Sequence, residues 1–185
     1  MNDFRPVSDS KIRIIELMIP SYANFGGKVH GGIILSLMDK IAYACATRHA
    51  RNYCVTASVD TVNFLTPVDV GAMVHMYASV NYVGNTSMEI GIRTESHNVK
   101  TGETRHTNTS YFTMVAIGED GKKAPVPGLI LSSKEDIRRF LEGKQRRSLK
   151  FKHSQAHIDL KGISLDDQSL SDLQEEKCQV MWKGD

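Results

Sequence analysis

The chain has 185 residues, 41% of them hydrophobic, which is enough to bury the core of a single domain. Its 23 basic and 21 acidic side chains nearly balance, which argues against the positive surface of a general nucleic-acid-binding protein. No apolar run reaches the length of a membrane span, and Met1–Asp9 lacks the charged-then-apolar pattern of a signal peptide. We therefore predict a cytoplasmic protein with no nucleic-acid or membrane partner.

The three cysteines are odd in number and do not follow the spacing of a metal site. Cys45 and His49 stand four residues apart and resemble half of such a site, but no second pair of ligands follows. We expect reduced thiols, as in a cytoplasmic protein, and no metal.

The first apolar segment, Ile14–Ile19, predicts a strand that ends at Pro20, and a polar loop from Ser21 to His30 follows it. Ile33–Arg48 then continues without a helix breaker, and its apolar residues recur at helical spacing in two adjacent rows. This pattern predicts a central helix that is covered on most of its sides. The helix lacks a Ser, Thr, Asp or Asn cap, so Gly31 and Gly32 are expected to leave backbone N–H groups free for a partner with negative charge.

Asp39 is the single carboxylate in this apolar helix. A carboxylate among apolar side chains is costly unless it is paired or used in chemistry. It could pair with Lys28, Lys40 or Arg48, face water on a narrow polar side, or act as a general base or nucleophile.

The period of the apolar residues changes from helical to alternating after the helix. Strands are predicted over Cys54–Phe64, Val74–Val83, Thr86–Val99 and Arg105–Ile117. Tight turns are predicted at Gly84-Asn85 and between Lys100 and Glu103. One helix followed by strands at this rhythm indicates an α+β domain in which a single antiparallel sheet curls around the helix.

A second helix is predicted from the capping pattern at Ser132–Asp136 to the basic residues Lys144–Arg147. Basic residues over 144–152 are typical of a solvated helix face. Beyond Lys152 the apolar residues are too sparse for an independent core, and Ser154–Asp185 is expected to be flexible or to depend on a partner. The predicted organisation is one domain over 1–152 with a polar tail over 153–185.

The spacing of Gly32 and Asp39 limits what one copy of the helix can do. Seven residues of α-helix separate them by about 10 Å, whereas a reacting carbonyl must lie about 3 Å from both its oxyanion donor and its base or nucleophile. Asn24 and the two glycines of one copy could instead meet Asp39 of a second copy. We therefore expect any catalytic site here to lie at a subunit interface.

These residues also resemble a known family, the hotdog-fold acyl-CoA thioesterases, in particular the broad-specificity bacterial enzymes and the vertebrate brain-type cytosolic enzyme. The resemblance runs from about Ser10 to Glu142 and leaves the tail uncovered. It is carried by Asn24, by Gly27-Lys28-Val29-His30-Gly31-Gly32, by Asp39, by Val55–Asp60 with Asn63-Phe64, by Ser87–Ile90, and by Tyr111–Val115.

The resemblance implies hydrolysis of fatty acyl-CoA without a cofactor, by a homodimer and further by a hexamer built as a trimer of dimers. Gly31 or Gly32 would hold the thioester oxygen, Asp39 would serve as base or nucleophile, and Asn24 would orient the water or the carbonyl. Independently of the resemblance, the basic residues over 144–152 have an alternative to a solvated face, which is to help hold the phosphates of coenzyme A. The residues implied to line the coenzyme are His30, Thr56, Ser58, Gly84, Asn85, Thr86 and Ser87.

Two other classes of protein stay open from the residues. A hotdog hydratase or dehydratase would pair His30 with an acid. A non-catalytic acyl-CoA sensor would keep the fold, but the presence of both Asn24 and Asp39 disfavours it, and the tail shows no DNA-binding helix pattern.

Overall fold

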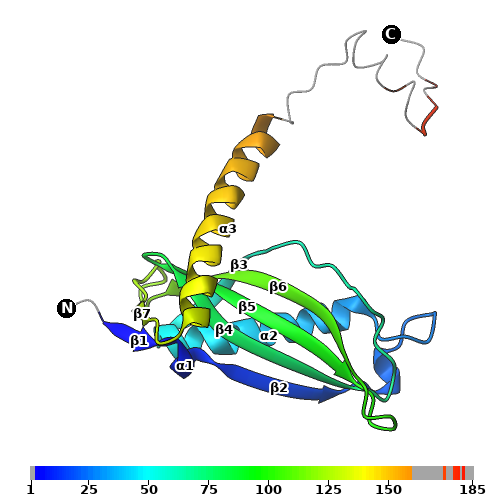
Figure 1. Ribbon diagram of the computed structural model, residues 1–185. Coiled ribbons are helices and arrows are strands. Elements are labelled where there is room, and N and C mark those ends of the chain that lie inside the picture. Colours follow the sequence, from blue (N-terminus) through cyan, green and yellow to red (C-terminus); the bar gives the residue numbers. More distant parts are fainter. Residues whose placement is uncertain (1–2, 160–172, 174–176, 180, 182–185) are drawn as a thin grey trace. The chain divides into compact units, whose positions relative to one another are not determined.

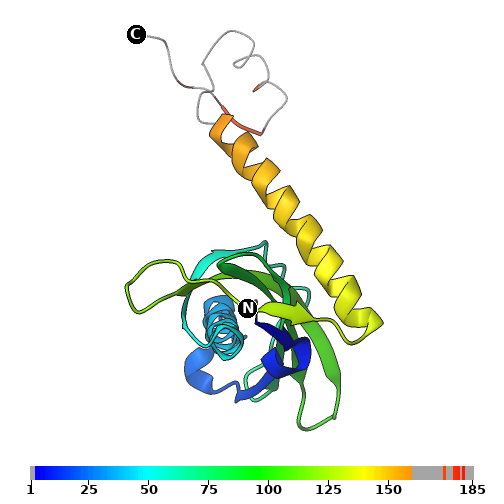
Figure 2. The same ribbon diagram turned by 90° about the vertical axis from the view of Figure 1, so that its left-hand side faces the viewer.

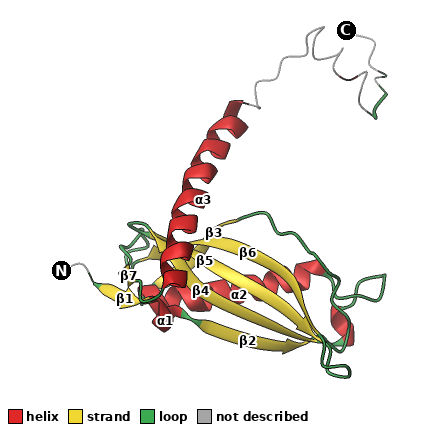
Figure 3. Cartoon of the chain, viewed as in Figure 1, coloured by secondary structure: helices red, strands yellow, loops and turns green. Residues whose placement is uncertain are grey.

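The computed structural model describes residues 3–159, 173, 177–179 and 181, and the side chains up to residue 152 of the longest helix (Figures 1 and 3). The elements in chain order are β1 (Phe4–Pro6), α1 (Val7–Ser10), β2 (Ile12–Leu17), a 3₁₀ turn (Pro20–Tyr22), α2 (Gly31–Ala50), β3 (Tyr53–Val59), β4 (Met73–Val83), β5 (Ser87–His97), β6 (Thr104–Ile117), β7 (Gly128–Ile130) and α3 (Lys134–Asp159).

Five strands form one antiparallel sheet in the order β2-β4-β5-β6-β3. The sheet curls around α2, which lies along its concave face (Figure 2). The expected α+β architecture, a single curled antiparallel sheet around a central helix, is therefore confirmed. β2 and β3 are the edge strands, so one side of each has no strand partner within the described sheet.

Buried and exposed side chains alternate along the strands, and the buried ones define the face of the sheet that packs against α2. On β6, Phe112, Met114 and Ala116 are buried, whereas the residues between them are partly exposed. On α2, Ile34, Met38 and Ile41 are buried toward the sheet. The core thus lies between one side of α2 and the inner face of the sheet.

Cys45 and His49, which resembled half of a metal site, are both buried and bonded to backbone carbonyls. The Cys45 thiol donates to the Ser10 carbonyl at 3.2 Å, and His49 Nε2 lies 3.0 Å from the Pro127 carbonyl. Burial raises the pKa of the Cys45 thiol to about 12, so it stays protonated. The described residues contain no cluster of three or more His, Cys, Asp or Glu that could hold a metal ion.

The N-terminal residues add structure that was not predicted from the sequence. β1 pairs in parallel with β7 as a separate two-stranded sheet. α1 places Ser10 next to β4. Ser10 Oγ donates to the Val7 carbonyl and accepts from the Val80 amide at 3.0 Å, so it is fully bonded although buried. These elements are too short to show a period in the sequence.

α3 begins where the capping pattern predicts. The Asp136 amide donates to Ser133 Oγ at 3.1 Å, and the Asp136 carboxylate accepts from the Ser132 amide at 3.2 Å. The predicted end at Lys144–Arg147 is wrong, because α3 continues to Asp159 and includes the first residues of the predicted tail. Lys, Arg, Gln and Leu are good helix formers, and a basic run need not end a helix when no Gly or Pro follows.

The start of α3 packs on the outer face of the sheet, the face turned away from α2. The Phe140 and Tyr82 rings are 5.0 Å apart between centroids. Gly143 allows this close approach, since a Cβ there would lie 2.8 Å from both Tyr82 Cβ and Glu89 Oε1.

The chain divides into two compact units, Met1–Lys144 and Gln145–Asp185, with the boundary inside α3. The division of the chain at residues 152 and 153 stays a prediction. Most of the predicted tail lies outside the described residues. None of the described helices is both long and apolar enough to cross a membrane.

Candidate active site

The candidate residues on α2 lie on its second side, away from the sheet. Leu35, Ser36, Asp39, Lys40 and Tyr43 are exposed at helical spacing. The prediction that the helix is covered on most sides is therefore wrong for the chain by itself. Asp39 is on this exposed side and forms no ion pair among the described residues, so the alternative of a salt bridge to Lys28, Lys40 or Arg48 is not realised.

The Asp39 carboxylate is held by the neighbouring edge strand. Thr56 Oγ1, on β3, donates to Asp39 Oδ1 at 2.6 Å and lies 3.4 Å from Met114 Sδ. A short O–H···O⁻ bond is among the stronger side-chain bonds and fixes the orientation of the carboxylate. The second oxygen, Oδ2, has no protein partner among the described residues, so it is available to a water molecule or a substrate. Thr56 was expected only near the coenzyme, and its contact with Asp39 was not predicted.

The start of α2 carries a cap that was not predicted from the sequence. His30 is the N-cap residue, and its Nδ1 accepts a hydrogen bond from the Gly32 amide at 2.9 Å. Glycine at position 32 permits this bond, because a Cβ there would lie 2.9 Å from the same Nδ1. The expectation that Gly32 offers a free N–H is therefore wrong. Gly31 remains the candidate oxyanion donor, with no hydrogen bond from its N–H among the described residues.

The cap also bears on the alternative role of His30. Since Nδ1 accepts a hydrogen bond, the ring proton resides on Nε2. A dehydratase base would need an unprotonated ring nitrogen that is open to the substrate. In His30 the unprotonated nitrogen, Nδ1, is used in the helix cap.

Asn24 forms a local turn just before α2. Its Oδ1 accepts from the amides of Gly26 at 2.9 Å and Lys28 at 3.1 Å, while Gly27 adopts a left-handed φ of 73°. These bonds orient the side-chain amide, and the Nδ2 group has no protein acceptor among the described residues. Asn24 can therefore donate a hydrogen bond to a ligand but is not free to accept one at Oδ1.

Phe64 is a further residue that was not assigned to the site from the sequence. A Cβ at Gly31 would lie 3.4 Å from the Phe64 ring, so the exposed aromatic ring lies against the start of α2. The loop that carries it is fixed to β6 by the Leu65 amide, which donates to the Thr107 carbonyl at 2.9 Å. Glycine at 31 keeps this approach open, and the ring forms an apolar wall beside the Gly31 amide.

The predicted coenzyme turn lies on the same end of the sheet as Thr56. Met88 pairs with Met114, and Met114 pairs with Thr56, so the turn before β5 stands two strand spacings, roughly 10 Å, from β3. The turn is a closed hairpin, because the Gly84 amide donates to the Ser87 carbonyl and the Asn85 and Thr86 carbonyls accept from Val126 and Ala116. Ser58 lies two residues beyond Thr56, after an irregularity in the β3–β6 pairing.

One chain thus holds two groups of candidate site residues at different places along one helix. Asn24 and Gly31 offer hydrogen-bond donors at its start, and Asp39 with Thr56 offers a carboxylate in its middle. α2 is continuous from Gly31 to Ala50, so Gly31 and Asp39, eight positions apart, are separated by about 12 Å along the helix. The donors and the carboxylate of one chain cannot reach the same carbonyl group.

Comparisons with known proteins show the family of this chain. Residues 26–103 match the model of the thioesterase superfamily. The VdlD protein of Helicobacter pylori is 44% identical over 141 residues, which cover 76% of this chain and 80% of that protein. A crystal structure of an apo-hexameric acyl-CoA thioesterase superimposes with a TM-score of 0.80 at 35% identity, over 82% of this chain and 97% of that one.

The acyl-CoA hydrolase of Staphylococcus aureus, solved with butyryl coenzyme A and coenzyme A, superimposes with a TM-score of 0.76. The two chains are 28% identical over 86% of this chain and 99% of that one. This chain therefore belongs to the thioesterase superfamily and is a hotdog-fold acyl-CoA thioesterase. The resemblance inferred from the residues is confirmed.

Proposed function

We propose that this thioesterase hydrolyses fatty acyl-CoA to fatty acid and free coenzyme A at a site shared by two copies of the chain. One copy supplies Asn24 and Gly31, and the other supplies Asp39 and Thr56. The observation that carries the proposal is the separation of these two groups on one unbroken helix. A second copy in the opposite direction brings the start of its α2 beside the middle of the first.

The surface around Asp39 suits such a pairing. Leu35 and Tyr43, on the exposed side of α2, are 38% and 41% exposed, and the Tyr53 ring on β3 contacts Tyr43 at 6.0 Å between centroids. β3 is an edge strand that can pair with its own copy across a two-fold axis. Apolar side chains beside an open strand edge form a surface that is expected to be buried between subunits.

The chemistry follows from the charge that develops on the thioester oxygen. The Gly31 N–H, at the positive end of the helix dipole, and the Asn24 Nδ2–H group would donate to this oxygen as it becomes negative. Asp39 Oδ2 of the other copy would take a proton from water, which attacks the carbonyl carbon, or would attack that carbon itself. In either route the C–S bond breaks and the thiolate of coenzyme A leaves with the bonding electrons.

Both routes use Thr56 in the same way. Its hydroxyl holds Oδ1, so that Oδ2 is directed to the reaction. Direct attack forms an anhydride between Asp39 and the acyl group, which water then hydrolyses to fatty acid and free Asp39. After one turnover in ¹⁸O-water, label in the Asp39 carboxylate shows direct attack with hydrolysis at the Asp39 carbon, whereas a general base leaves the label only in the fatty acid.

Variants of the S. aureus hydrolase support this assignment of residues. Structures of that enzyme were solved with single alanine replacements of an asparagine, an aspartate and a threonine. The spacing of the three replaced positions equals the spacing of Asn24, Asp39 and Thr56 in this chain. We propose that the three residues act together here.

We further propose that the dimers associate as a hexamer, because the acyl-CoA thioesterase that superimposes with a TM-score of 0.80 is hexameric. The reaction needs no metal or redox cofactor in this scheme. The three cysteines are unbridged, which suits the reducing cytoplasm that we propose as the location.

The test is release of free thiol from acyl-CoA substrates of increasing chain length by the purified chain, with and without a chelator. We expect turnover on fatty acyl-CoA that the chelator leaves unchanged. Thiol release at background level on the whole series would refute the proposal, and water addition to an enoyl-CoA without thiol release would indicate a hydratase instead.

A further inference from the structure

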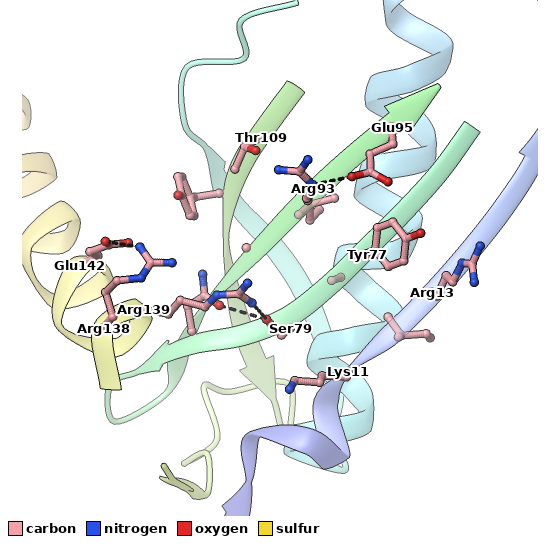
Figure 4. A pocket seen from close by; sticks show the side chains of 16 residues that line it. Lys11, Arg13, Tyr77, Ser79, Arg93, Glu95, Thr109, Arg138, Arg139 and Glu142 are labelled. Carbon is pink, nitrogen blue, oxygen red and sulfur yellow. Dashed lines mark hydrogen bonds and ion pairs between the residues drawn. The ribbon is translucent and has the colours of Figure 1, made fainter. Parts of the chain in front are cut away.

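A cavity lies on the outer face of the sheet, on the opposite side from Asp39 and α2. Its volume is about 720 Å³, and residues from β2, β4, β5, β6 and the first turns of α3 line it (Figure 4). Cavities of this size hold small organic ligands. None of the residues proposed for thioester hydrolysis is among its lining residues.

The floor of the cavity is polar and closely packed. Strand pairing places Ser79 next to Gly91, and Gly91 next to Tyr111. The Asn81 side chain lies over Gly91, where any Cβ would overlap its amide nitrogen. Position 91 therefore has to be glycine for Asn81 to occupy this place.

The Asn81 amide is only half satisfied by the protein. Asn81 Oδ1 accepts from Ser79 Oγ at 3.1 Å, and these two residues are only 6% and 4% exposed. The Asn81 Nδ2 group has no acceptor among the described residues. Because Asn81 lines the cavity, this donor is available to an acceptor from outside the chain.

The walls of the cavity carry more positive than negative charge. The lining includes two acids, Glu95 and Glu142, and five basic residues, Lys11, Arg13, Arg93, Arg138 and Arg139. The acids are used in ion pairs, Glu95 with Arg93 and Glu142 with Arg138 (Figure 4).

Two of these cations lie close to the polar floor. Arg139 donates to Ser79 Oγ at 3.4 Å, although it also pairs with Glu135. Lys11 directly precedes Ile12, which pairs with Ala78, so Lys11 lies beside Ser79. The Lys11 ammonium has no partner among the described residues.

We propose that this cavity binds a small organic phosphate, with its phosphate group above Gly91 between Lys11, Asn81 and Arg139. The Lys11 ammonium, the Arg139 guanidinium and Asn81 Nδ2 can donate hydrogen bonds but cannot accept them. The ligand must therefore supply several acceptor oxygens and negative charge. A tetrahedral phosphate can accept from donors in three directions, whereas the two oxygens of a carboxylate lie in one plane. The Tyr77 and Tyr111 rings provide aromatic surface for the rest of the molecule.

Calorimetric titration of the full chain with phenyl phosphate, and separately with inorganic phosphate, tests this site. We expect phenyl phosphate to bind more tightly than inorganic phosphate, because only its ring can contact the tyrosines. Lys11→Glu should weaken phenyl phosphate at least about tenfold, the effect of losing one charge-assisted hydrogen bond. Lys122→Glu is the matched control, since Lys122 is also exposed and does not line the cavity.

Asn81→Ala removes the donor without a change of charge and should weaken phenyl phosphate but leave thiol release from acyl-CoA unchanged. Thermal unfolding checks that each variant is folded. Equal affinity for phenyl phosphate in the Lys11→Glu and Lys122→Glu variants would overturn the proposed site. A crystal structure in which a second copy of the chain fills the cavity would also overturn it. This site does not depend on the proposed reaction, so thiol release and phosphate binding can fail separately.

Discussion

The two sides of α2 differ in what covers them within one chain. The inner side is formed by Met38, Ile41 and Cys45, which are buried against the sheet. The outer side presents Leu35, Asp39 and Tyr43, all exposed. The inner side stabilises the fold, whereas the outer side holds an oriented carboxylate beside apolar surface.

Residues that stabilise the fold and residues proposed for the reaction therefore lie on different sides of a single helix. Neighbours along the sequence, such as Met38 and Asp39, serve different purposes because they point about 100° apart around the helix axis. Substitutions on the two sides should therefore affect different measurements.

The largest effect on turnover is expected for Asp39→Ala. Loss of the general base or nucleophile should lower kcat at least roughly a hundredfold. The midpoint of thermal unfolding should change little, because Asp39 is exposed and its main bond is to Thr56. A variant that is folded and retains near wild-type kcat would remove Asp39 from the mechanism.

Met38→Ala tests the other side of the same helix. Met38 is fully buried, and truncation of such a side chain typically lowers the free energy of unfolding by about 2 to 5 kcal/mol. Chemical denaturation measures this loss. We expect kcat of the folded fraction to remain close to that of the wild type. A hundredfold loss of kcat in fully folded protein would contradict the separation of the two sides.

Thr56→Val should have an intermediate effect on turnover. It removes the hydrogen bond to Asp39 Oδ1 while it keeps the shape of the side chain. A bond to a charged group contributes about 1.5 to 3 kcal/mol, so kcat should fall about tenfold to a hundredfold. Thr56→Ser keeps the hydroxyl and is the matched control. Equal losses in both variants would show that the hydroxyl does not position Asp39.

His49 provides the smallest effect, on the dependence of stability on pH. Burial lowers the pKa of His49 below its usual 6.5, although the bond to the Pro127 carbonyl opposes this shift. The unfolded chain therefore binds a proton before the folded one does, and stability is complete above pH 6.5 and falls as the pH drops toward the folded pKa. One proton changes the free energy of unfolding by at most about 1.4 kcal/mol per pH unit.

His49→Gln should flatten this dependence, whatever its effect on stability at neutral pH. Chemical denaturation at several pH values between about 5 and 8 on the two proteins measures the difference. An identical slope below pH 6.5 in both proteins would show that His49 does not take up the proton.

The fold could be predicted from the sequence because apolar periods determine it. The helical rows after Ile33 and the alternation over Arg105–Ile117 specify the central helix and the last long strand. β1 and α1 are too short to show a period. The predicted end of α3 was wrong because a basic run was interpreted as a stop signal, although no Gly or Pro lies between Lys144 and Asp159.

The candidate site could be predicted only in part. Asp39 and Asn24 stand out by residue type and by their place near a glycine-rich helix start. The bond between Thr56 and Asp39 joins residues 17 positions apart and depends on how β3 returns along α2, which no local pattern shows. The His30 cap was missed because histidine is not among the preferred capping residues.

The central claim, that two copies share one site, is tested most directly by mixing inactive variants. Asn24→Ala and Asp39→Ala homodimers should each be nearly inactive. A mixed dimer carries both defects in one site and neither in the other, so thiol release should return toward half of the wild-type kcat per dimer. Two different affinity tags on the co-expressed chains isolate the mixed dimers. Mixed dimers that are isolated in this way and remain inactive would contradict the shared site, because Asn24 and Asp39 would then have to act within one chain.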